Sequence, residues 1–114
     1  YAMWENPRYQ DERYAYIFDF STVLAVGETI TDSQPPVTIE PRGDAEQDLA
    51  PNDQIDGSSL VVDGKYVVQY ITGGELGVTY VARCTVNTTK SRIITSELRF
   101  QVYANTGRRA RGST

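Results

Sequence analysis

The side chains that most often carry out catalysis are scarce in this sequence. The 114 residues contain no histidine and one cysteine, Cys84. Without histidine, the common serine and cysteine triads have no general base, and a zinc site lacks its most frequent ligand. Cys84 falls on the apolar face of an alternating segment, where a thiol acts as a small hydrophobic group in the core. The sequence therefore predicts no catalytic residue.

The acidic residues in the middle of the chain are the remaining candidates for a binding site. Residues 44–48, D-A-E-Q-D, open like an EF-hand calcium loop. An EF-hand also requires Gly at its sixth position and Glu at its twelfth, where this chain has Leu49 and Ile55. A looser calcium site that uses Asp53 or Asp56 stays open as an alternative. A solvated acidic loop is the simpler interpretation, and we predict neither a metal nor a cofactor.

Charge and hydropathy exclude two further classes of partner. The net charge of −4 argues against a general nucleic-acid-binding protein. Arg108, Arg109 and Arg111 near the C-terminus supply too few phosphate contacts for tight binding. They suit an acidic surface on a partner protein, or simply keep this end soluble. No apolar run approaches the roughly 18 residues of a membrane-spanning helix. We therefore expect no nucleic acid and no membrane as partners.

Two alternating segments predict core strands, because a period of two buries one face of a strand. Residues 13–20 carry four aromatic side chains on one face, namely Tyr14, Tyr16, Phe18 and Phe20. Residues 92–103 form the predicted final strand, with one face made of Ile94, Ser96, Leu98, Phe100 and Val102. Both faces offer enough apolar surface to build a core.

Residues 72–87 predict a turn followed by the central strand. Gly73-Gly74 marks the turn, and Tyr80, Ala82, Cys84 and Val86 then share one face. The entry at 76–80 has the pattern of a tyrosine corner, in which the hydroxyl of a Tyr at the start of a late sandwich strand bonds to backbone slightly upstream. We therefore expect an immunoglobulin-like sandwich. Its structural core residues would include Phe18, Phe20, Tyr80, Cys84 and Phe100.

Residues 59–71 carry the clearest local signal. Asp63-Gly64 between two apolar, β-branched runs predicts a two-residue hairpin turn, because a type I′ turn needs positive φ at both positions. Leu60 and Val62 share a face of the first arm. On the second arm, one alternative places Tyr66, Val68 and Tyr70 inward, and the other places Val67, Gln69 and Ile71 inward. The polar Gln69 favours the first alternative.

The segments between these strands predict less regular structure. Residues 28–31 read as a short second strand. Residues 37–39 are flanked by proline, which suits an edge strand because proline cannot donate to a ladder. Residues 42–57 are acidic and poor in apolar side chains, so we expect a long loop there.

These segments together predict an all-β fold. It is an immunoglobulin-like or fibronectin-III-like antiparallel β-sandwich of about seven strands. Residues 13–104 would form the sandwich, with the long acidic loop at 42–57. Residues 1–12 would form an N-terminal extended arm, and residues 105–114 a flexible basic C-terminal tail.

The arm is unusual because it is apolar. It carries Tyr1, Met3, Trp4 and Tyr9, which an exposed flexible segment would not normally present to water. Two alternatives stay open: the arm folds back over the edge of the sandwich, or it anchors on another chain. With the arginines of the tail, these residues are the candidate partner contacts.

Two stretches resemble a known family. The first contains Asp19-Phe20-Ser21, then Leu24, Gly27-Glu28-Thr29-Ile30 and Ser33. The second contains Thr72-Gly73-Gly74 and Gly77-Val78-Thr79-Tyr80, followed by a strand that alternates threonine and valine. These steps resemble small virion proteins of tailed bacteriophages known as fibre–tail adaptor proteins. The resemblance covers most of residues 14–103, and the acidic loop is longer than is usual in that family.

The resemblance implies a structural protein of the virion, made in the cytoplasm of a bacterial host. It implies an immunoglobulin-like adaptor that joins tail, neck or baseplate to fibres, and it implies no enzymatic activity. Its partners would be other virion proteins, such as tail, connector or fibre subunits, together with copies of itself. A capsid decoration or cement protein is one alternative. A module that binds host glycans through exposed tyrosines and the acidic loop is another.

Overall fold

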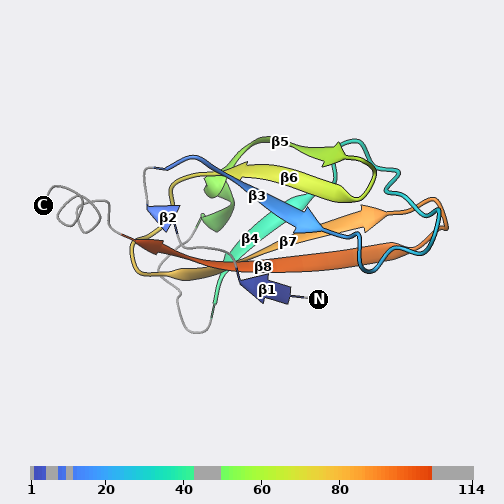
Figure 1. The fold of residues 1–114 in the computed structure, drawn as a ribbon. Coiled ribbons are helices and arrows are strands. Elements are labelled where there is room, and N and C mark those ends of the chain that lie inside the picture. The colour runs from blue at the N-terminus through green and yellow to red at the C-terminus, as the bar shows by residue number, and fades with distance from the viewer. Residues whose placement is uncertain (1, 5–7, 10–11, 43–49, 104–114) are drawn as a thin grey trace, which may run out of the picture.

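The described residues of the computed structural model, which are 2–4, 8–9, 12–42 and 50–103, form two β-sheets around a shared core (Figure 1). One sheet has the order β3-β6-β5, with β3 at Tyr14–Asp19, β6 at Tyr66–Ile71 and β5 at Ile55–Val62. We call it the β3–β6–β5 sheet. All of its pairings are antiparallel.

The other sheet, called here the β4–β7–β8 sheet, contains β4 at Val37–Pro41, β7 at Thr79–Asn87 and β8 at Ile93–Tyr103. The strands β7 and β8 form a long antiparallel hairpin, and β4 pairs with β7 alone at the edge. The edge position predicted from the flanking prolines is therefore confirmed.

The N-terminal segment adds two short strands to this second sheet. β1 at Ala2–Trp4 and β2 at Arg8–Tyr9 both pair with β8 in parallel. The backbone of this segment thus lies along the edge of β8, which is one of the two alternatives that its sequence left open. The side chains of Tyr1, Met3, Trp4 and Tyr9 lie outside the described residues, so their contacts stay a prediction.

Aromatic side chains from both sheets meet in the core. Tyr16 on β3 stacks on Phe100 on β8, with 5.0 Å between ring centroids, and Phe100 stacks on Tyr80 at 5.6 Å. Phe18, Phe20 and Cys84 are also fully buried. Burial desolvates the thiol and raises the pKa of Cys84 to about 12, so it stays protonated. Tyr14 differs from this pattern because it lies at the outer end of β3 and is 44% exposed.

The turn before β7 has the geometry of a tyrosine corner. The backbone N–H of Glu75 donates to the hydroxyl of Tyr80 at 2.8 Å, and the ring of Tyr80 is fully buried. The alternation of Tyr80, Ala82, Cys84 and Val86 into the core is confirmed. The corner therefore fixes the path of the chain between the two sheets.

The hairpin between β5 and β6 is confirmed, with a small difference in length. Asp63 and Gly64 both have positive φ, at 56° and 67°. The register pairs Val62 with Tyr66, so Lys65 also belongs to the connection.

The preference for the inward face of β6 was wrong. Gln69 is buried together with Val67 and Ile71, while Tyr66, Val68 and Tyr70 face outward. The pairing of β5 with β6 shifts register between Asp56 and Leu60, and this bulge leaves carbonyl groups without ladder partners. The side-chain amide of Gln69 donates to the carbonyls of Gly57 at 3.1 Å and Tyr70 at 3.0 Å. A buried amide with these partners is satisfied, which is why a polar residue occupies the core here.

Two further expectations need correction. Residues 28–31 do not form a strand; they contribute one bridge between Ile30 and Thr88. The second half of the expected acidic loop is ordered, because η1 spans Pro51–Gln54 and β5 begins at Ile55. The side-chain carbonyl of Asn52 in η1 accepts a hydrogen bond from the backbone N–H of Ile39 at 2.7 Å. The helix η1 therefore covers part of the edge of β4. Residues 43–49 lie outside the described residues.

Candidate assembly surfaces

The outer face of the β3–β6–β5 sheet carries a row of aliphatic side chains across all its strands. The register pairs Val68 on β6 with Ile17 on β3 and with Leu60 on β5. Ile17 is 49% exposed and Leu60 60% exposed. Each aliphatic side chain left in water forgoes the stabilisation that burial would give, about 1.5–3 kcal/mol for a full side chain. This row is the centre of what we call the apolar face.

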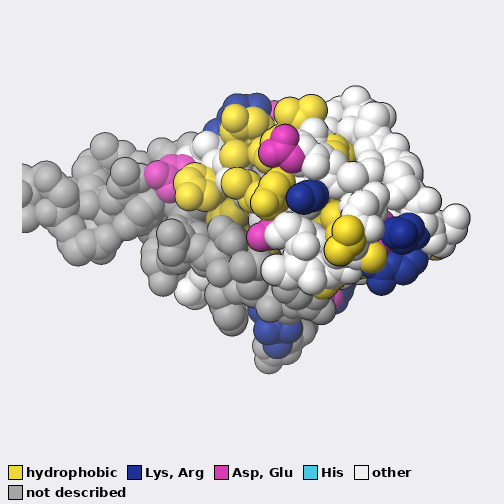
Figure 2. Space-filling model, turned by 45° about the vertical axis from the view of Figure 1, so that its right-hand side comes forward, with side chains coloured by type: hydrophobic (Ala, Val, Ile, Leu, Met, Phe, Trp, Pro, Cys, Tyr) yellow, Lys and Arg dark blue, Asp and Glu magenta, His cyan; other side chains and the backbone are white. Residues whose placement is uncertain are grey.

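Two flanking rows extend the apolar face. Tyr66 pairs in register with Val62 and Asp19, and Tyr70 pairs with Ala15 and Asp56. The face therefore consists of Ala15, Ile17, Leu60, Val62, Tyr66, Val68 and Tyr70. Figure 2 shows hydrophobic side chains gathered on one side of the molecule, with acidic and basic groups beside them.

Charged groups stand at the ends of the apolar face. Arg13 lies over the ring of Tyr70, with its guanidinium carbon 3.8 Å from the ring centroid, and its Nε donates to Asp56 at 2.6 Å. Asp19 and the two exposed charges of the hairpin turn, Asp63 and Lys65, lie toward the other end. The carboxylate of Asp19 accepts a hydrogen bond from the backbone N–H of Ser21 at 2.8 Å. An apolar centre with a polar rim is the usual composition of a protein–protein contact.

The outer face of the β4–β7–β8 sheet is mainly polar by contrast, apart from the exposed Ile93 at the start of β8. Arg83 on β7 forms ion pairs with Glu40 on β4 and Glu97 on β8. Hydrogen bonds to these two carboxylates raise the pKa of Arg83, and the bond from Arg83 lowers the pKa of Glu97. Thr85 and Thr95 share a hydrogen bond at 2.9 Å on the same face. These groups, which we call the charge ladder, satisfy one another across the strands.

A buried carboxylate fastens the loop after β3 to the turn between β7 and β8. Glu28 is 2% exposed. Arg92 donates to both of its oxygens, at 2.9 Å and 2.5 Å, and the hydroxyl of Thr88 and the backbone N–H of Ala25 donate as well. These hydrogen bonds, led by the one from Arg92, lower the pKa of Glu28 to about 2. The cluster stabilises the ionised carboxylate and holds the two loops together.

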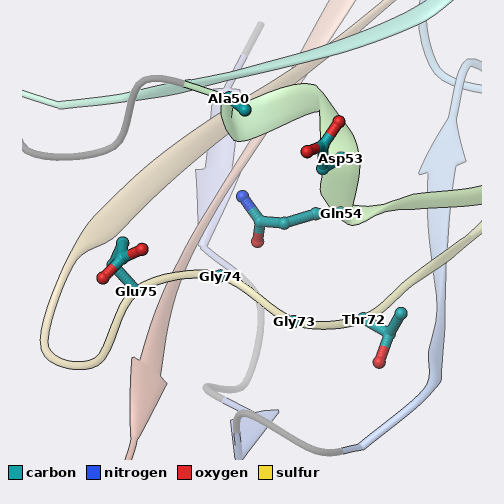
Figure 3. Close-up of a pocket in the computed structure, with 7 residues that line it drawn as sticks. All are labelled: Ala50, Asp53, Gln54, Thr72, Gly73, Gly74 and Glu75. Atoms are coloured by element: carbon teal, nitrogen blue, oxygen red, sulfur yellow. The ribbon is translucent and has the colours of Figure 1, made fainter.

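The opposite end of the sandwich contains a cavity of about 250 Å³ between η1 and the turn before β7 (Figure 3). The buried side chain of Gln54 points between these two segments. Gly74 has a φ of 95°, and a Cβ there would lie 2.7 Å from Oε1 of Gln54. Asp53 and Glu75 stand on different sides of the cavity, so their carboxylates do not converge on one point. The glycine is needed for close packing at this turn.

The described residues contain no group of three or more His, Cys, Asp or Glu side chains that could hold a metal ion. Of the two acids considered for calcium, Asp56 is engaged by Arg13. No helix in the described part of the chain is long and apolar enough to span a membrane.

Comparison with known protein families identifies the family of this chain. The model of the family described as podophage GP4 fiber-tail adaptor protein gp77 matches residues 8–101. The chain belongs to this family. The resemblance read from the two sequence stretches around Asp19 and Tyr80 is thereby confirmed. None of the curated proteins matches the chain. As a member of a phage fibre–tail adaptor family, this chain has a structural role in the virion.

The apolar face of this adaptor-family chain was not recognised from its sequence. The signal was present in β6, Y-V-V-Q-Y-I, which is apolar on both of its faces. A strand with two apolar faces is typical of sheets that are covered on both sides, whereas the outer face of β6 lies uncovered in the described residues. The arginines Arg108, Arg109 and Arg111 lie outside the described residues, and their role as partner contacts stays a prediction.

Proposed function

We propose that this chain is a non-enzymatic adaptor with an immunoglobulin-type sandwich, which joins tail, neck or baseplate to fibres through protein–protein contacts. The observation that carries the proposal is the family match over residues 8–101. Its partners would be fibre, tail or connector subunits and further copies of the chain, and its location the tail, neck or baseplate of the virion.

The strand order supports the immunoglobulin type. An immunoglobulin sandwich of the constant type places strands B, E and D in one sheet and C, F and G in the other. Here β3-β6-β5 has the order B-E-D, and β4-β7-β8 has the order C-F-G. The tyrosine corner at Tyr80 opens β7, the counterpart of strand F. Ala82 stands two residues later, where antibody domains have the second cysteine of their disulfide. The core would therefore hold the sheets together without a bridge.

The apolar face supports contacts with other proteins. Its central row of Ile17, Val68 and Leu60 crosses the whole sheet, and its charges stand at the ends. Contiguous apolar patches of this kind on a soluble protein often mark interaction sites. A face that gains burial only in an assembly suits a component that acts inside a particle.

The proposal can be tested in the phage that encodes the chain. An amber mutation in its gene, grown in a non-suppressing host, is expected to give particles that lack fibres when viewed by electron microscopy. Adding back the purified wild-type chain should restore the fibres, and labelled chain should lie at the tail. A suppressing host serves as the control, because it makes the full protein from the same allele.

Two outcomes would overturn the adaptor role. Mutant particles with complete fibres and a weakened capsid would identify a decoration or cement protein. Normal fibres together with direct binding of the isolated chain to host polysaccharide would identify a glycan-binding module.

A further inference from the structure

We infer that the outer edge of β3 pairs, strand to strand and antiparallel, with β3 of a second copy of this chain, so that two β3–β6–β5 sheets join into one. This contact rests on the proposed function only for its setting, a particle in which copies lie close together. Three observations carry it: the open edge of β3, the direction of its backbone groups, and the charges at its ends.

The outer edge of β3 differs from the other strand edges of the described residues. The edge of β8 carries β1 and β2, and the edge of β4 is capped by Asn52, whose side chain binds the backbone N–H of Ile39. The edge of β5 is interrupted by the bulge between Asp56 and Leu60. β3 ends the sheet order β3-β6-β5 and pairs with β6 in a regular register. Proteins usually block such edges, because their unpaired backbone groups recruit another strand.

The type of sandwich leaves space for a strand at this edge. An immunoglobulin sandwich of the constant type places strand A beside strand B, and β3 is the counterpart of strand B. In this chain the described N-terminal strands pair with β8 instead. The architecture therefore accommodates a further strand beside β3, and that strand can belong to another molecule.

Alternate residues of β3 direct their backbone groups toward this edge. The backbone N–H of Phe20 donates to the carbonyl of Lys65 at 3.0 Å, on the side of β6. The register between β3 and β6 has no shift, and successive residues of an antiparallel strand point in opposite directions. The N–H and C=O groups of Ala15, Ile17 and Asp19 therefore point away from β6. Only an extended backbone can complete such a ladder.

A second copy of β3 fits the edge in one register. When two β3 strands run antiparallel about Tyr16, Ala15 lies opposite Ile17 of the second copy. Both residues point their backbone groups at the shared edge, so they form a hydrogen-bonded pair. The same register places Arg13 opposite Asp19 of the second copy, and twofold symmetry repeats each contact. A shift by two residues, which is the smallest that retains the ladder, separates these charges.

The side chains at the edge also suit this register. The Nε of Arg13 bonds to Asp56, and its terminal nitrogens offer further donors to a second carboxylate. The Oδ1 of Asp19 accepts one backbone N–H, and its Oδ2 can accept a bond from the guanidinium of the second copy. Between the two ion pairs, the 49% exposed Ile17 would lie beside the small Ala15 of the second copy. No like charges face each other along the paired strands.

The contact depends on main-chain hydrogen bonds and two ion pairs, and it buries little apolar area. Free molecules should therefore associate weakly, since association carries a large cost in lost translational and rotational freedom. Copies held close together in a particle meet at a high effective concentration, which offsets this cost.

Disulfide trapping tests both the contact and its register. Cys84 is fully buried and stays protonated, so an introduced surface cysteine is the reactive thiol. A hydrogen-bonded pair has its Cα atoms about 5.5 Å apart, which a disulfide can span. Under mild oxidation, a mixture of Ala15→Cys and Ile17→Cys should form covalent dimers at least about tenfold faster than either variant alone. A mixture of Ala15→Cys and Ile93→Cys gives the collisional baseline, because Ile93 is 74% exposed on the other sheet.

Charge reversal tests the ion pairs at the ends of the contact. Asp19→Lys, added to both cysteine variants, should remove the faster trapping, because it places a cation opposite Arg13. The further change Arg13→Glu should restore it, since both pairs are then opposite in sign again. Asp53→Lys is the matched control, because Asp53 is exposed but lies in η1. Thermal unfolding shows that each variant is folded.

A mixture of Ala15→Cys and Ile17→Cys that reacts no faster than the baseline would overturn the inference. Equal trapping in the single variants, or equal effects of Asp19→Lys and Asp53→Lys, would overturn it as well. These failures are separable from failure of the adaptor role. A chain that does not pair through β3 but restores fibres to mutant particles would remove the copy–copy contact and leave the adaptor role in place. A chain that pairs through β3 but does not restore fibres would do the reverse.

Discussion

The two outer faces of the sandwich differ in the side chains that they present at their centres. On the β4–β7–β8 sheet, Arg83 pairs with carboxylates on both neighbouring strands, so these three charged groups satisfy one another. On the β3–β6–β5 sheet, the equivalent central row consists of Ile17, Val68 and Leu60. Both faces cover the same core, and both follow the alternation of a strand. The difference is that the first face pairs its central charged groups within the molecule, whereas the second exposes aliphatic side chains to solvent.

The difference between the two faces depends first on which side of β6 lies inward. A substitution on the inward side of β6 should therefore cause the largest loss of unfolding free energy. Gln69→Ala removes hydrogen bonds to the carbonyls of Gly57 and Tyr70 and leaves a void in the core. We expect a loss of about 2–4 kcal/mol in unfolding free energy, measured by urea denaturation. Val68→Thr on the outer side has nearly the same shape and should change stability by less than about 1 kcal/mol. Equal effects would mean that the burial of β6 has been misassigned.

This strand also shows where sequence reasoning reached its limit. For β7 and β8, one face of each strand is apolar and the other polar, so the period alone determined which side is buried. For β6, both faces are apolar except for Gln69, so the period could not assign a direction. The polar residue turned inward because a bulge in β5 offers it carbonyl partners. A bulge of this kind depends on pairing between strands, and the sequence of one strand does not reveal it.

The N-terminal segment was hard to predict for a related reason. Residues 1–12 show neither helical nor strand periodicity, and parallel pairing with β8 joins opposite ends of the chain. The turns were predicted more reliably because their chemistry is local. Asp63 and Gly64 adopt positive φ, and Tyr80 bonds to a backbone group five residues before it. Local signals thus defined the turns and the strands with two different faces, while the apolar face emerged only from the register of the whole sheet.

A polar group that is fully buried should respond strongly to acid. The folded pKa of Glu28 is about 2, compared with an ordinary value of 4.5. As pH falls below about 4.5, the unfolded state takes up a proton that the folded state does not, so stability present above that pH is lost progressively toward pH 2. Thermal unfolding measured across this window should show the decline. Glu28→Gln should lower the midpoint temperature of unfolding at pH 7. It should also make the decline of this temperature between pH 4.5 and pH 2 shallower. A variant with the wild-type slope would show that other groups cause the acid sensitivity.

The tyrosine corner should contribute less than the buried side of β6, because Tyr80→Phe removes one hydrogen bond and leaves the ring in place. The lost partner is the backbone N–H of Glu75. We expect a loss of about 1–3 kcal/mol, since the N–H is left without its acceptor. Chemical denaturation measures it, with Tyr14→Phe as the control because Tyr14 is 44% exposed. If Tyr80→Phe lowers the unfolding free energy no more than Tyr14→Phe does, the hydrogen bond of the corner does not contribute to stability.

The smallest effect should come from the charge ladder itself. Arg83→Met breaks both ion pairs, but the Arg83 side chain is 40% exposed, and its Glu40 partner is 52% exposed. Exposed pairs of this kind contribute about 0–1 kcal/mol. The loss should disappear in 1 M NaCl, where the screening length falls to about 3 Å. A loss that persists in 1 M NaCl would mean that Arg83 stabilises the sheet through the packing of its side chain and not through the ion pairs.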